Sequence, residues 1–367
     1  TSSLTGQAPV PILRKAGFRK PGDKLRMAFI GSWGRGGANL EEFYKLGENI
    51  VALCDVDMNH LNHAAKHIEP KFPKVRRYQD WRRMLDEEKN LDAVVVSIPD
   101  HMHAICAIAA MERGCHVYVE KPLVRTWWEA ERFREVAKAC GVVTQMGNNG
   151  NGNDGQRRNV EVLQSGVLGE IDEIHVTTDR PIWPQGLMKP AEGEKCPDTL
   201  SWDLFIGPAE SRPYHSAYTP WNWRGWYDFG TGALGDMALH ILDPVWQALN
   251  PGHPTSIIAS STMSNFFSPP HAEEITYTFP ARPKKGKVKM PSFKLRWVDG
   301  GLMPPRPEEL EDGQMMGDEN GGLIFVGTKG KIMTGCYGMN PTLLPFSRME
   351  SFKEPKPYLP RIAGEVK

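Results

Sequence analysis

The sequence predicts a doubly wound α/β domain followed by an α+β domain built on an antiparallel sheet. From position 24 to 148, apolar strand patterns alternate with helical patterns of about 10–15 residues, which is typical of a parallel sheet. After a polar, glycine-rich break at 148–156, alternating strand patterns with Gly- and Pro-rich turns replace this order. The chain of 367 residues is also long enough for about two domains.

The first domain is expected to span residues 24–148, after an extended arm at 1–23 that is rich in Pro, Lys and Arg. Expected strands lie at 24–31, 49–57, 74–78, 91–99, 115–122 and 142–148. Expected helices lie at 38–47, 58–68, 80–88, 103–114 and 127–141. The β-branched run in the fourth strand is typical of a sheet that helices cover on both faces, and Asp80 is an expected helix N-cap.

The second domain is expected to span residues 149–367. One helix is expected at 157–169, where a glycine ends it. Alternating patterns then predict strands at 170–181, 256–263, 273–281, 293–300, 321–330 and 331–338. This run of strands predicts an α+β domain with an antiparallel sheet.

Composition excludes several classes of protein. The 44 basic side chains balance 44 acidic ones, so no net field draws the chain toward nucleic acid or anionic lipid. No apolar run approaches the roughly 18 residues that suggest a membrane span. The 6 cysteines contain no CxxC pair, which favours free thiols over a disulfide framework.

The stretch MAFIGSWGRGGANL at 27–40 predicts a strand, a glycine-rich turn and a helix. Gly31 and Gly36 hold the first and third positions of G-x-G-x-x-G, but Trp33 holds the second. Gly34 can relax the turn, so that a phosphate still reaches the amides at the helix start. On its own, the motif fits a plain tight turn equally well. The expected cofactor contacts here are Gly31, Ser32, Trp33, Gly34, Arg35 and Gly36.

Asp55 ends the second strand about 20 residues past Gly36, where dinucleotide-binding folds place an acid. A carboxylate there can accept both ribose hydroxyls of NAD and would repel the 2′-phosphate of NADP. The alternative role is a helix N-cap, for which Asp57 is also available. Together, the strand, the turn, the helix and the acid favour a dinucleotide site.

Three further motifs are SIPDHMHA at 97–104, VEKPL at 119–123 and GTGALGDMALH at 230–240. With the glycine turn and the segments TQMGN, RPIWPQG and WDLFIGPA, they make the stretch from 24 to 345 resemble a bacterial branch of the Gfo/Idh/MocA oxidoreductases. This is the family of glucose–fructose oxidoreductase and inositol dehydrogenase. The resemblance implies an NAD-binding Rossmann domain, and a second domain with a large open-faced antiparallel sheet for substrate binding and oligomerisation. It also implies a homo-oligomer, either a dimer or a tetramer.

Lys121, Asp236 and His240 are the expected catalytic residues. The resemblance implies that Lys121, which follows a parallel strand, contacts the nicotinamide ribose and the substrate hydroxyl. Asp236 and His240 are spaced i, i+4, so on a helix they share one face. Because oxidising an alcohol requires removal of a proton, we expect His240 as the general base and Lys121 as the group that polarises the oxygen. Asp236 is expected to orient either the imidazole or a sugar hydroxyl; an N-cap aspartate and a packed histidine are the alternative.

The remaining expected contacts border the same crevice. Aromatic faces and an arginine suit a sugar, and the expected substrate contacts are Lys121, Trp221, Trp223, Arg224, Tyr227, Asp236 and His240. Beyond the glycine turn and Asp55, the expected cofactor contacts are Ile98, Pro99, His101, His103, Glu120, Lys121, Asn148, Trp223 and Arg224. No metal is expected at His101 and His103, or on the helical stripe of His60, His63 and His67.

Two departures from the family pattern leave the substrate open. They are Trp33 in the glycine turn and the polar NNGNG at 148–152, which differs from the arginine-bearing loop common in the family. We expect an NAD-dependent oxidoreductase that acts on a hydroxyl of a sugar, cyclitol or glycoside. Two alternatives stay open: a redox-neutral, NAD-dependent glycoside hydrolase that uses transient oxidation and elimination, and a non-catalytic sugar-binding protein.

The expected partner is a carbohydrate-like small molecule, and neither nucleic acid nor a membrane is expected. The chain starts at Thr1 without an initiator methionine, so we expect that it has been processed or trimmed. Two compartments therefore stay open: the cytoplasm, and the periplasm after export in folded, cofactor-loaded form.

Overall fold

The computed structural model describes residues 10–190, 192–285 and 288–361. Contacts within the chain divide it into two compact units. The first unit holds the chain up to Gly147 together with Pro190–Trp223 and Asp228–Gly230, and the second unit holds the rest. The division after Gly147 lies next to the expected boundary after 148, whereas the two returning segments of the first unit are additions to the expected domain.

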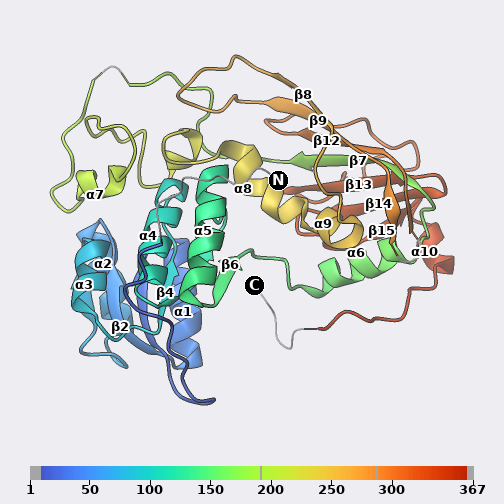
Figure 1. Ribbon diagram of the computed structural model, residues 1–367. Helices are drawn as coiled ribbons and strands as arrows, with labels where there is room; N and C mark the ends of the chain where they lie inside the picture. The colour runs from blue at the N-terminus through green and yellow to red at the C-terminus, as the bar shows by residue number, and fades with distance from the viewer. Residues whose placement is uncertain (1–9, 191, 286–287, 362–367) are drawn as a thin grey trace. The chain divides into compact units, whose positions relative to one another are not determined.

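The first unit contains a six-stranded sheet in which every neighbouring pair is parallel, with the order β3-β2-β1-β4-β5-β6. Its strands are β1 (Arg26–Ile30), β2 (Asn49–Cys54), β3 (Arg76–Tyr78), β4 (Ala93–Val96), β5 (His116–Glu120) and β6 (Thr144–Gly147). The strand order reverses between β1 and β4, so the carboxyl ends of these strands flank the crevice at which doubly wound sheets bind ligands. The predicted doubly wound sheet is therefore confirmed (Figure 1).

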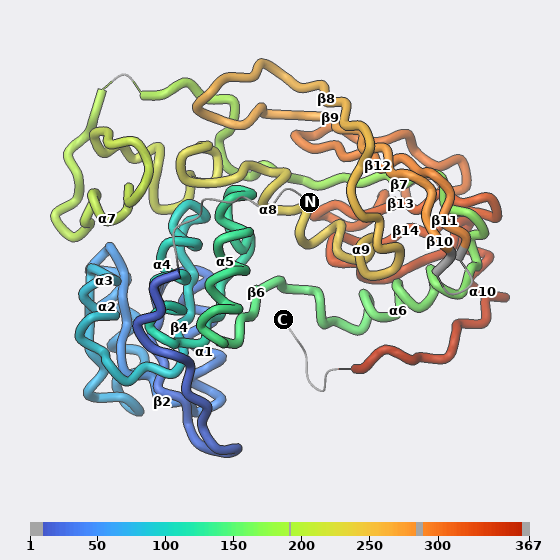
Figure 2. Tube along the Cα trace, in the orientation of Figure 1, coloured from blue at the N-terminus to red at the C-terminus, as the bar shows by residue number. Residues whose placement is uncertain are grey.

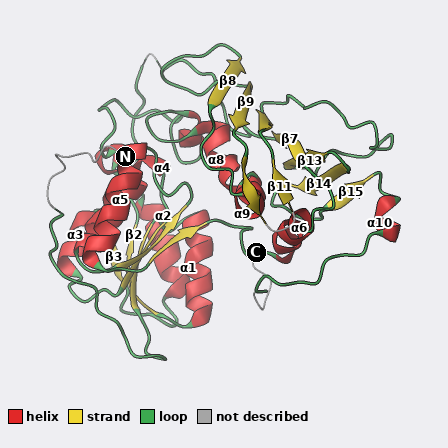
Figure 3. Cartoon of the chain, turned by 45° about the vertical axis from the view of Figure 1, so that its right-hand side comes forward, coloured by secondary structure: helices red, strands yellow, loops and turns green. Residues whose placement is uncertain are grey.

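Helices cover both faces of this sheet (Figure 3). They are α1 (Arg35–Leu46), α2 (Met58–Ile68), α3 (Trp81–Glu87), α4 (Asp100–Glu112) and α5 (Trp127–Cys140). On one face, Leu40 of α1 and Leu61 of α2 pack with Phe29 of β1. On the other face, α3, α4 and α5 pack on strand residues such as Val94. Asp80 caps α3 as predicted, because its side chain accepts a hydrogen bond from the N–H of Arg82.

The described part of the N-terminal arm lies along the edge of the sheet at which β4 and β5 begin. The guanidinium of Arg14 donates to the carbonyl oxygens of Lys89, Leu91 and Arg113. Further along the arm, the guanidinium of Arg19 pairs with the Asp92 carboxylate at 3.0 Å. The described part of the arm is therefore fastened to the first unit by the hydrogen bonds of Arg14 and by the Arg19–Asp92 ion pair, whereas residues 1–9 of the expected arm lie outside the described residues.

The second unit contains a seven-stranded sheet with the order β15-β14-β13-β7-β12-β9-β8, and a separate β10–β11 hairpin that Figure 2 labels. The strands are β7 (Ile171–Thr178), β8 (Ser256–Ser261), β9 (Glu273–Phe279), β10 (Arg282–Lys285), β11 (Val288–Met290), β12 (Phe293–Val298), β13 (Gly321–Gly327), β14 (Gly330–Gly335) and β15 (Thr342–Leu344). The predicted antiparallel sheet is confirmed with one exception, because β7 and β12 pair in parallel. The sequence patterns missed β10, β11 and β15, which are too short to show a period.

One face of this sheet is covered by α6 (Asp154–Gln164), α8 (Gly232–Ile241) and α9 (Asp243–Leu249), which pack around the buried indole of Trp297. The helix expected at 157–169 is wrong in its bounds. α6 begins earlier because the Asn153 side chain caps it by accepting a hydrogen bond from the N–H of Gln156 at 2.7 Å. The sequence patterns also missed α7 (Trp202–Ile206), the 3₁₀ helix at Asn222–Gly225, α9 and α10 (Arg348–Ser351).

The opposite face of the sheet is only partly covered. The loop after β12 packs Leu310 and Met316 onto Ile324 and Met333. Elsewhere Glu173 of β7 and Lys294 of β12 are exposed, and on the edge strand β8 all six residues are exposed, Ile257 and Ile258 among them. This confirms the expected open-faced sheet.

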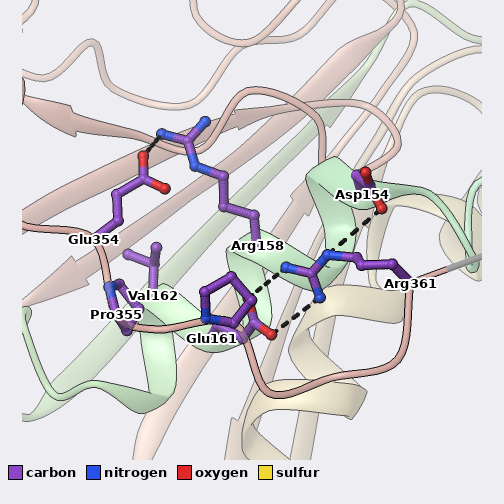
Figure 4. Close-up of a pocket in the computed structure, with 8 residues that line it drawn as sticks. Asp154, Arg158, Glu161, Val162, Glu354, Pro355 and Arg361 are labelled. Atoms are coloured by element: carbon purple, nitrogen blue, oxygen red, sulfur yellow. Dashed lines mark hydrogen bonds and ion pairs between the residues drawn. The ribbon is translucent and has the colours of Figure 1, made fainter.

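The C-terminal tail is clasped to α6 through Glu161 (Figure 4). The buried Glu161 carboxylate accepts from the N–H groups of Tyr358 and Leu359, both at 2.8 Å, and pairs with Arg361 at 2.7 Å. Burial opposes its charged form, but these partners outweigh burial and lower the pKa of Glu161 to about 2. Beside the clasp lies a cavity of about 200 Å³, lined by charged side chains that include the Arg158–Glu354 ion pair.

A pair of carboxyl groups lies at one end of β9 and β12. The Asp299 carboxylate accepts from the Glu273 N–H and from the Trp297 indole N–H, both at 3.0 Å. Burial raises the pKa of Glu273 to about 7, and the neighbouring Asp299 carboxyl adds to this rise. Burial also raises the pKa of Asp299 to about 6, although hydrogen bonds from Trp297 and Glu273 oppose the rise. The folded protein therefore holds protons here that an unfolded chain would have released.

We expect the replacement Glu273→Gln to make the free energy of unfolding less dependent on pH. An unfolded Glu releases its proton near pH 4.3, so between about pH 4 and 7 the folded state binds more protons than the unfolded state, and stability falls as pH rises. Glutamine removes that loss, and the variant should exceed the parent in stability at pH 8 by about 1–3 kcal/mol. Urea unfolding at pH 5 and pH 8 measures the difference. Asp172→Asn, at an exposed position of β7, is the matched control, and an equal pH dependence in the parent and in Glu273→Gln would contradict the prediction.

Candidate functional site

The glycine turn brings β1, α1 and β4 into close contact in the first unit. Gly31 has φ +90°, and a Cβ on it would lie 2.1 Å from the carbonyl oxygen of Ser97. A Cβ on Gly36 would lie 2.4 Å from the carbonyl oxygen of Gly31. Both positions therefore require glycine, which accounts for the first and third positions of the fingerprint.

The start of α1 suits an anion. Gly34 is its N-cap, with φ 56°, and among the described residues no side chain caps this end and no acid lies in the first turn. The N–H groups of a helix start carry partial positive charge and bind phosphate oxygens well. The start of this 12-residue helix therefore fits the pyrophosphate of a dinucleotide.

Asp55 lies beside the glycine turn and is tied to it. Its Oδ2 accepts from the N–H and the hydroxyl of Ser32, at 2.9 and 3.0 Å, and its Oδ1 accepts from the Asp57 N–H at 3.0 Å. Burial raises the pKa of Asp55, although these hydrogen bonds oppose the rise. Since a carboxylate has about four acceptor positions, about one is left for a ribose hydroxyl. Asp57 takes the N-cap role, accepting from the Asn59 N–H at 2.8 Å.

Trp33, the residue that breaks the fingerprint, stacks on a histidine of α2. The Trp33 and His60 rings are 4.5 Å apart between centroids, with an angle of 6° between their planes, and Trp33 is 48% exposed. The stack explains where the large side chain goes at a position that usually holds glycine. The indole is therefore held against α2 by His60.

Glu120, just before Lys121, is buried and bound to two side chains of α1. Its Oε1 accepts from the amide of Asn39 at 2.8 Å and pairs with Arg35 Nε at 3.1 Å. The Asn39 amide also donates to the Ser97 hydroxyl at 3.0 Å. Asn39 and Ser97 were not among the predicted site residues, because no local pattern marks a side chain whose partner lies far along the chain. These bonds connect the ends of β4 and β5 with α1, and so hold the turn that carries Lys121.

His103 joins the same two strand ends. Its Nδ1 lies 2.6 Å from the carbonyl oxygen of Pro122, and its Nε2 lies 2.7 Å from that of Ile98. Because carbonyl oxygens only accept, the ring satisfies both only when both nitrogens carry a proton. His103 therefore connects the turn at Ile98–Pro99 with the turn at Lys121–Pro122.

His101 is buried among aromatic rings of the returning segments. Its Nε2 donates to the carbonyl oxygen of Phe205 at 2.9 Å, and the Phe229 ring lies 5.2 Å away between centroids. Its Nδ1 has no hydrogen-bond partner among the described residues. Burial lowers the pKa of His101 to about 4, helped by the charge on Arg125 and opposed by the bond to Phe205. The imidazole is therefore neutral near pH 7.

In the second unit, α8 carries both Asp236 and His240, as the i, i+4 spacing predicts. An oxygen of the Asp236 carboxylate lies 3.5 Å from Arg224 Nε. The Arg224 guanidinium in turn lies 5.8 Å from the centre of the Trp183 ring. Tyr227 of this unit is partly exposed, at 43%. The structure therefore brings Arg224 and Asp236 together. Trp221 and Trp223, expected beside them, belong to the first unit, and there Trp223 is buried.

The imidazole of His240 is oriented by the backbone. Its Nδ1 lies 2.9 Å from the carbonyl oxygen of Asn149, and the Tyr337 ring meets it edge-on at 5.0 Å between centroids. A carbonyl oxygen only accepts, so Nδ1 carries the proton and Nε2 carries the lone pair of the neutral ring. Asn148, an expected cofactor contact, donates its amide to the Leu239 carbonyl oxygen at 2.9 Å, and its own Oδ1 is buried without a partner among the described residues.

Two further features bear on function. The described residues contain no group of three or more His, Cys, Asp or Glu side chains arranged to hold a metal ion. Every helix in the described part of the chain falls short of the length and apolar character that a bilayer crossing requires.

Two models of one protein family match the chain. The NAD-binding Rossmann-fold model of the GFO/IDH/MocA oxidoreductase family matches residues 25–148, and the model of its C-terminal α/β domain matches residues 161–265. Among solved structures, the WlbA dehydrogenase from Bordetella pertussis, in complex with NADH and UDP-GlcNAcA, is similar with a TM-score of 0.60 at 18% identity. That match covers 88% of this chain and 83% of the WlbA chain.

Relatives of known name are similar over shorter stretches. Glycosyl hydrolase family 109 protein 1 of Shewanella sp. (strain ANA-3) is 32% identical over 179 residues, 46% of this chain and 39% of that protein. The α-N-acetylgalactosaminidase of Shewanella oneidensis is 31% identical over 153 residues, 40% of this chain and 33% of that protein. The chain therefore spans less than half the length of these two relatives. Since both family models match in chain order and together cover more than half of the chain, it belongs to the Gfo/Idh/MocA oxidoreductases, and its first domain is of their NAD-binding Rossmann type.

Proposed function

We propose that this chain is an NAD-dependent oxidoreductase that oxidises a hydroxyl of a sugar, cyclitol or glycoside. The observation that carries the proposal is the hydrogen bond of 2.9 Å between His240 Nδ1 and the Asn149 carbonyl oxygen, which leaves Nε2 as the basic nitrogen of the neutral ring, in a chain whose first domain is of the NAD-binding type. An alcohol must lose a proton as it is oxidised, and an imidazole suits that task near pH 7. Bound NAD supplies the hydride acceptor.

The chain's own residues have distinct roles in this proposal. The N–H groups at the start of α1 hold the pyrophosphate, and Asp55 accepts one ribose hydroxyl. The Asp55 carboxylate disfavours a 2′-phosphate, which is why we propose NAD rather than NADP. His103 and Glu120 support the cofactor site from inside the first unit rather than by touching the cofactor.

The substrate side of the proposal uses four residues. Lys121 polarises the reacting oxygen, and His240 takes its proton. Arg224 and Asp236, which lie close together, bind neighbouring hydroxyls. We also propose a homo-oligomer, because part of one sheet face and the edge strand β8 are uncovered in the described chain.

A second candidate is a redox-neutral glycoside hydrolase that oxidises its substrate only transiently and breaks the glycosidic bond by elimination. The observation that favours it is the similarity to the two Shewanella proteins, which are named as glycoside-cleaving enzymes. It uses the same cofactor and the same base, so the site residues alone do not separate the two candidates.

One experiment separates them. The purified chain is incubated with NAD or NADP and a panel of sugars, cyclitols and 4-nitrophenyl glycosides, while NADH absorbance and released 4-nitrophenol are recorded. We expect NADH to accumulate with NAD, and kcat/KM to be lower with NADP. Release of 4-nitrophenol without net NADH would support the second candidate. A flat calorimetric titration with NAD, together with no turnover on the panel, would overturn both.

A further inference from the structure

We propose that Asp243 and the loop Asn148–Asn153 form a positioning device for His240. The loop has the sequence NNGNGN and follows β6, so it stands where the sequence departs from its family. The role of His240 as a base belongs to the function proposed above, and the positioning inference rests on that role. The tautomer that the device imposes can be measured independently of activity.

Asp243, the first residue of α9, accepts hydrogen bonds from side-chain amides of the loop, of α6 and of α9. Its Oδ2 accepts from Asn151 Nδ2 at 2.5 Å, from Gln156 Nε2 at 2.6 Å and from Asn148 Nδ2 at 3.4 Å. Its Oδ1 accepts from Gln247 Nε2 at 3.3 Å. A carboxylate accepts only, so each of these amides must turn its nitrogen toward Asp243. One half-buried carboxylate thus holds Asn148 and Asn151 of the loop together with Gln156 of α6.

The loop is also held against the elements around the imidazole. The Asn148 amide donates to the carbonyl oxygen of Leu239, the residue before His240. Gly150 lies against the Tyr337 ring so closely that a Cβ would stand 2.9 Å from the ring's Cδ1 atom. The same Tyr337 ring packs on His240. Both the loop and the imidazole are therefore fitted to Tyr337.

These contacts have one consequence for chemistry. They place the Asn149 carbonyl oxygen 2.9 Å from His240 Nδ1, which keeps the proton on Nδ1 and the lone pair on Nε2. A base whose lone pair sat on Nδ1 would face a carbonyl oxygen and could not accept a substrate proton there. Asp243 and Asn149 are therefore positioning residues that act through His240. Because the loop is rich in asparagine, a single carboxylate can bind several of its side chains and fix its conformation.

The test measures directly which nitrogen of the His240 ring carries the proton. The 367-residue chain is labelled with ¹⁵N-histidine, and long-range ¹H–¹⁵N correlation spectra report which ring nitrogen carries the proton. His240→Gln identifies the signals of this ring. We expect the Nδ1–H tautomer in the parent, and a mixture of tautomers in Asp243→Ala and in the milder Asn151→Ala. We expect kcat to fall about 10- to 100-fold in Asp243→Ala, as is typical when an outer partner of a catalytic group is lost, while KM for NAD stays the same.

Asp312→Ala, an exposed carboxylate outside the device, is the matched control and should change neither quantity. An Nε2–H tautomer in the parent would overturn the proposal. It would also be overturned if folded Asp243→Ala and Asn151→Ala had the same His240 tautomer and the same kcat as the parent. Asn151→Ala keeps the test decisive if Asp243→Ala does not fold. Failure of the proposed function has a different signature, because His240→Gln would then retain full turnover while the tautomer in the parent was still as stated.

Discussion

Replacing His240 by alanine is expected to lower kcat by about 10²- to 10⁴-fold, the range typical for the loss of a general base. The imidazole is held on α8 with Nδ1 against a carbonyl oxygen, so its Nε2 is the atom suited to receive the substrate proton. Alanine leaves that proton to solvent. Steady-state turnover on a substrate found with the panel measures the loss, and calorimetric titration with NAD shows whether cofactor binding persists.

The control for this variant is His63→Ala, on the exposed side of α2. It should leave kcat unchanged, since His63 has no part in the proposed site. If His240→Ala keeps the kcat of the parent, His240 is not the base. The proton would then leave by another group, and the proposed role of His240 would be lost.

Replacing Gly31 by alanine is expected to lower the free energy of unfolding of the first unit by about 2–6 kcal/mol, because strained backbone and overpacking each contribute about 1–3 kcal/mol. Gly31 has φ +90°, and the new Cβ would lie 2.1 Å from a backbone oxygen of β4. Backbone cannot move aside as a flexible side chain can. Urea unfolding measures the loss, and calorimetry should show that NAD binding is weakened with it.

Gly34→Ala is the matched control. Gly34 also has a positive φ, 56°, but no described atom lies within 4 Å of the added Cβ. With ψ at −120°, Gly34 lies outside the left-handed helical region, and its replacement should cost about 1–3 kcal/mol, the strain of that backbone conformation alone. Equal losses in the two variants would show that strain, and not the contact between β1 and β4, sets the need for glycine at position 31.

The first unit was largely predictable from its sequence. Short apolar strands alternate with amphipathic helices, and both periods are visible in the residues themselves. The cap at Asp80 was predictable for the same reason, since capping is local. The returning segments Pro190–Trp223 and Asp228–Gly230 were not predictable, because loops without a period give no sign of the unit on which they pack.

In the candidate site, the helix that carries Asp236 and His240 was predictable, whereas the hydrogen bonds that connect His240 with the rest of the chain were not. The spacing of Asp236 and His240 placed both on one helix, and α8 confirms that placement. The partner of His240 is a main-chain carbonyl of Asn149, and a sequence carries no mark of which carbonyl will be used. The polar NNGNG segment was visible as a departure, but its meaning depends on Asp243, which lies far along the chain.

The clasp between Glu161 and the tail has a consequence for mutations that remove the segment around Arg361. α6 begins directly after the loop that contains Asn149. Arg361 forms ion pairs with two residues of this helix, Glu161 and, at 3.5 Å, Asp154 in the first turn. A premature stop codon that deletes Arg361 would leave a buried carboxylate without its cation and would loosen the helix start. Truncations and frameshifts there can therefore reduce turnover, although the deleted residues lie outside the proposed catalytic set.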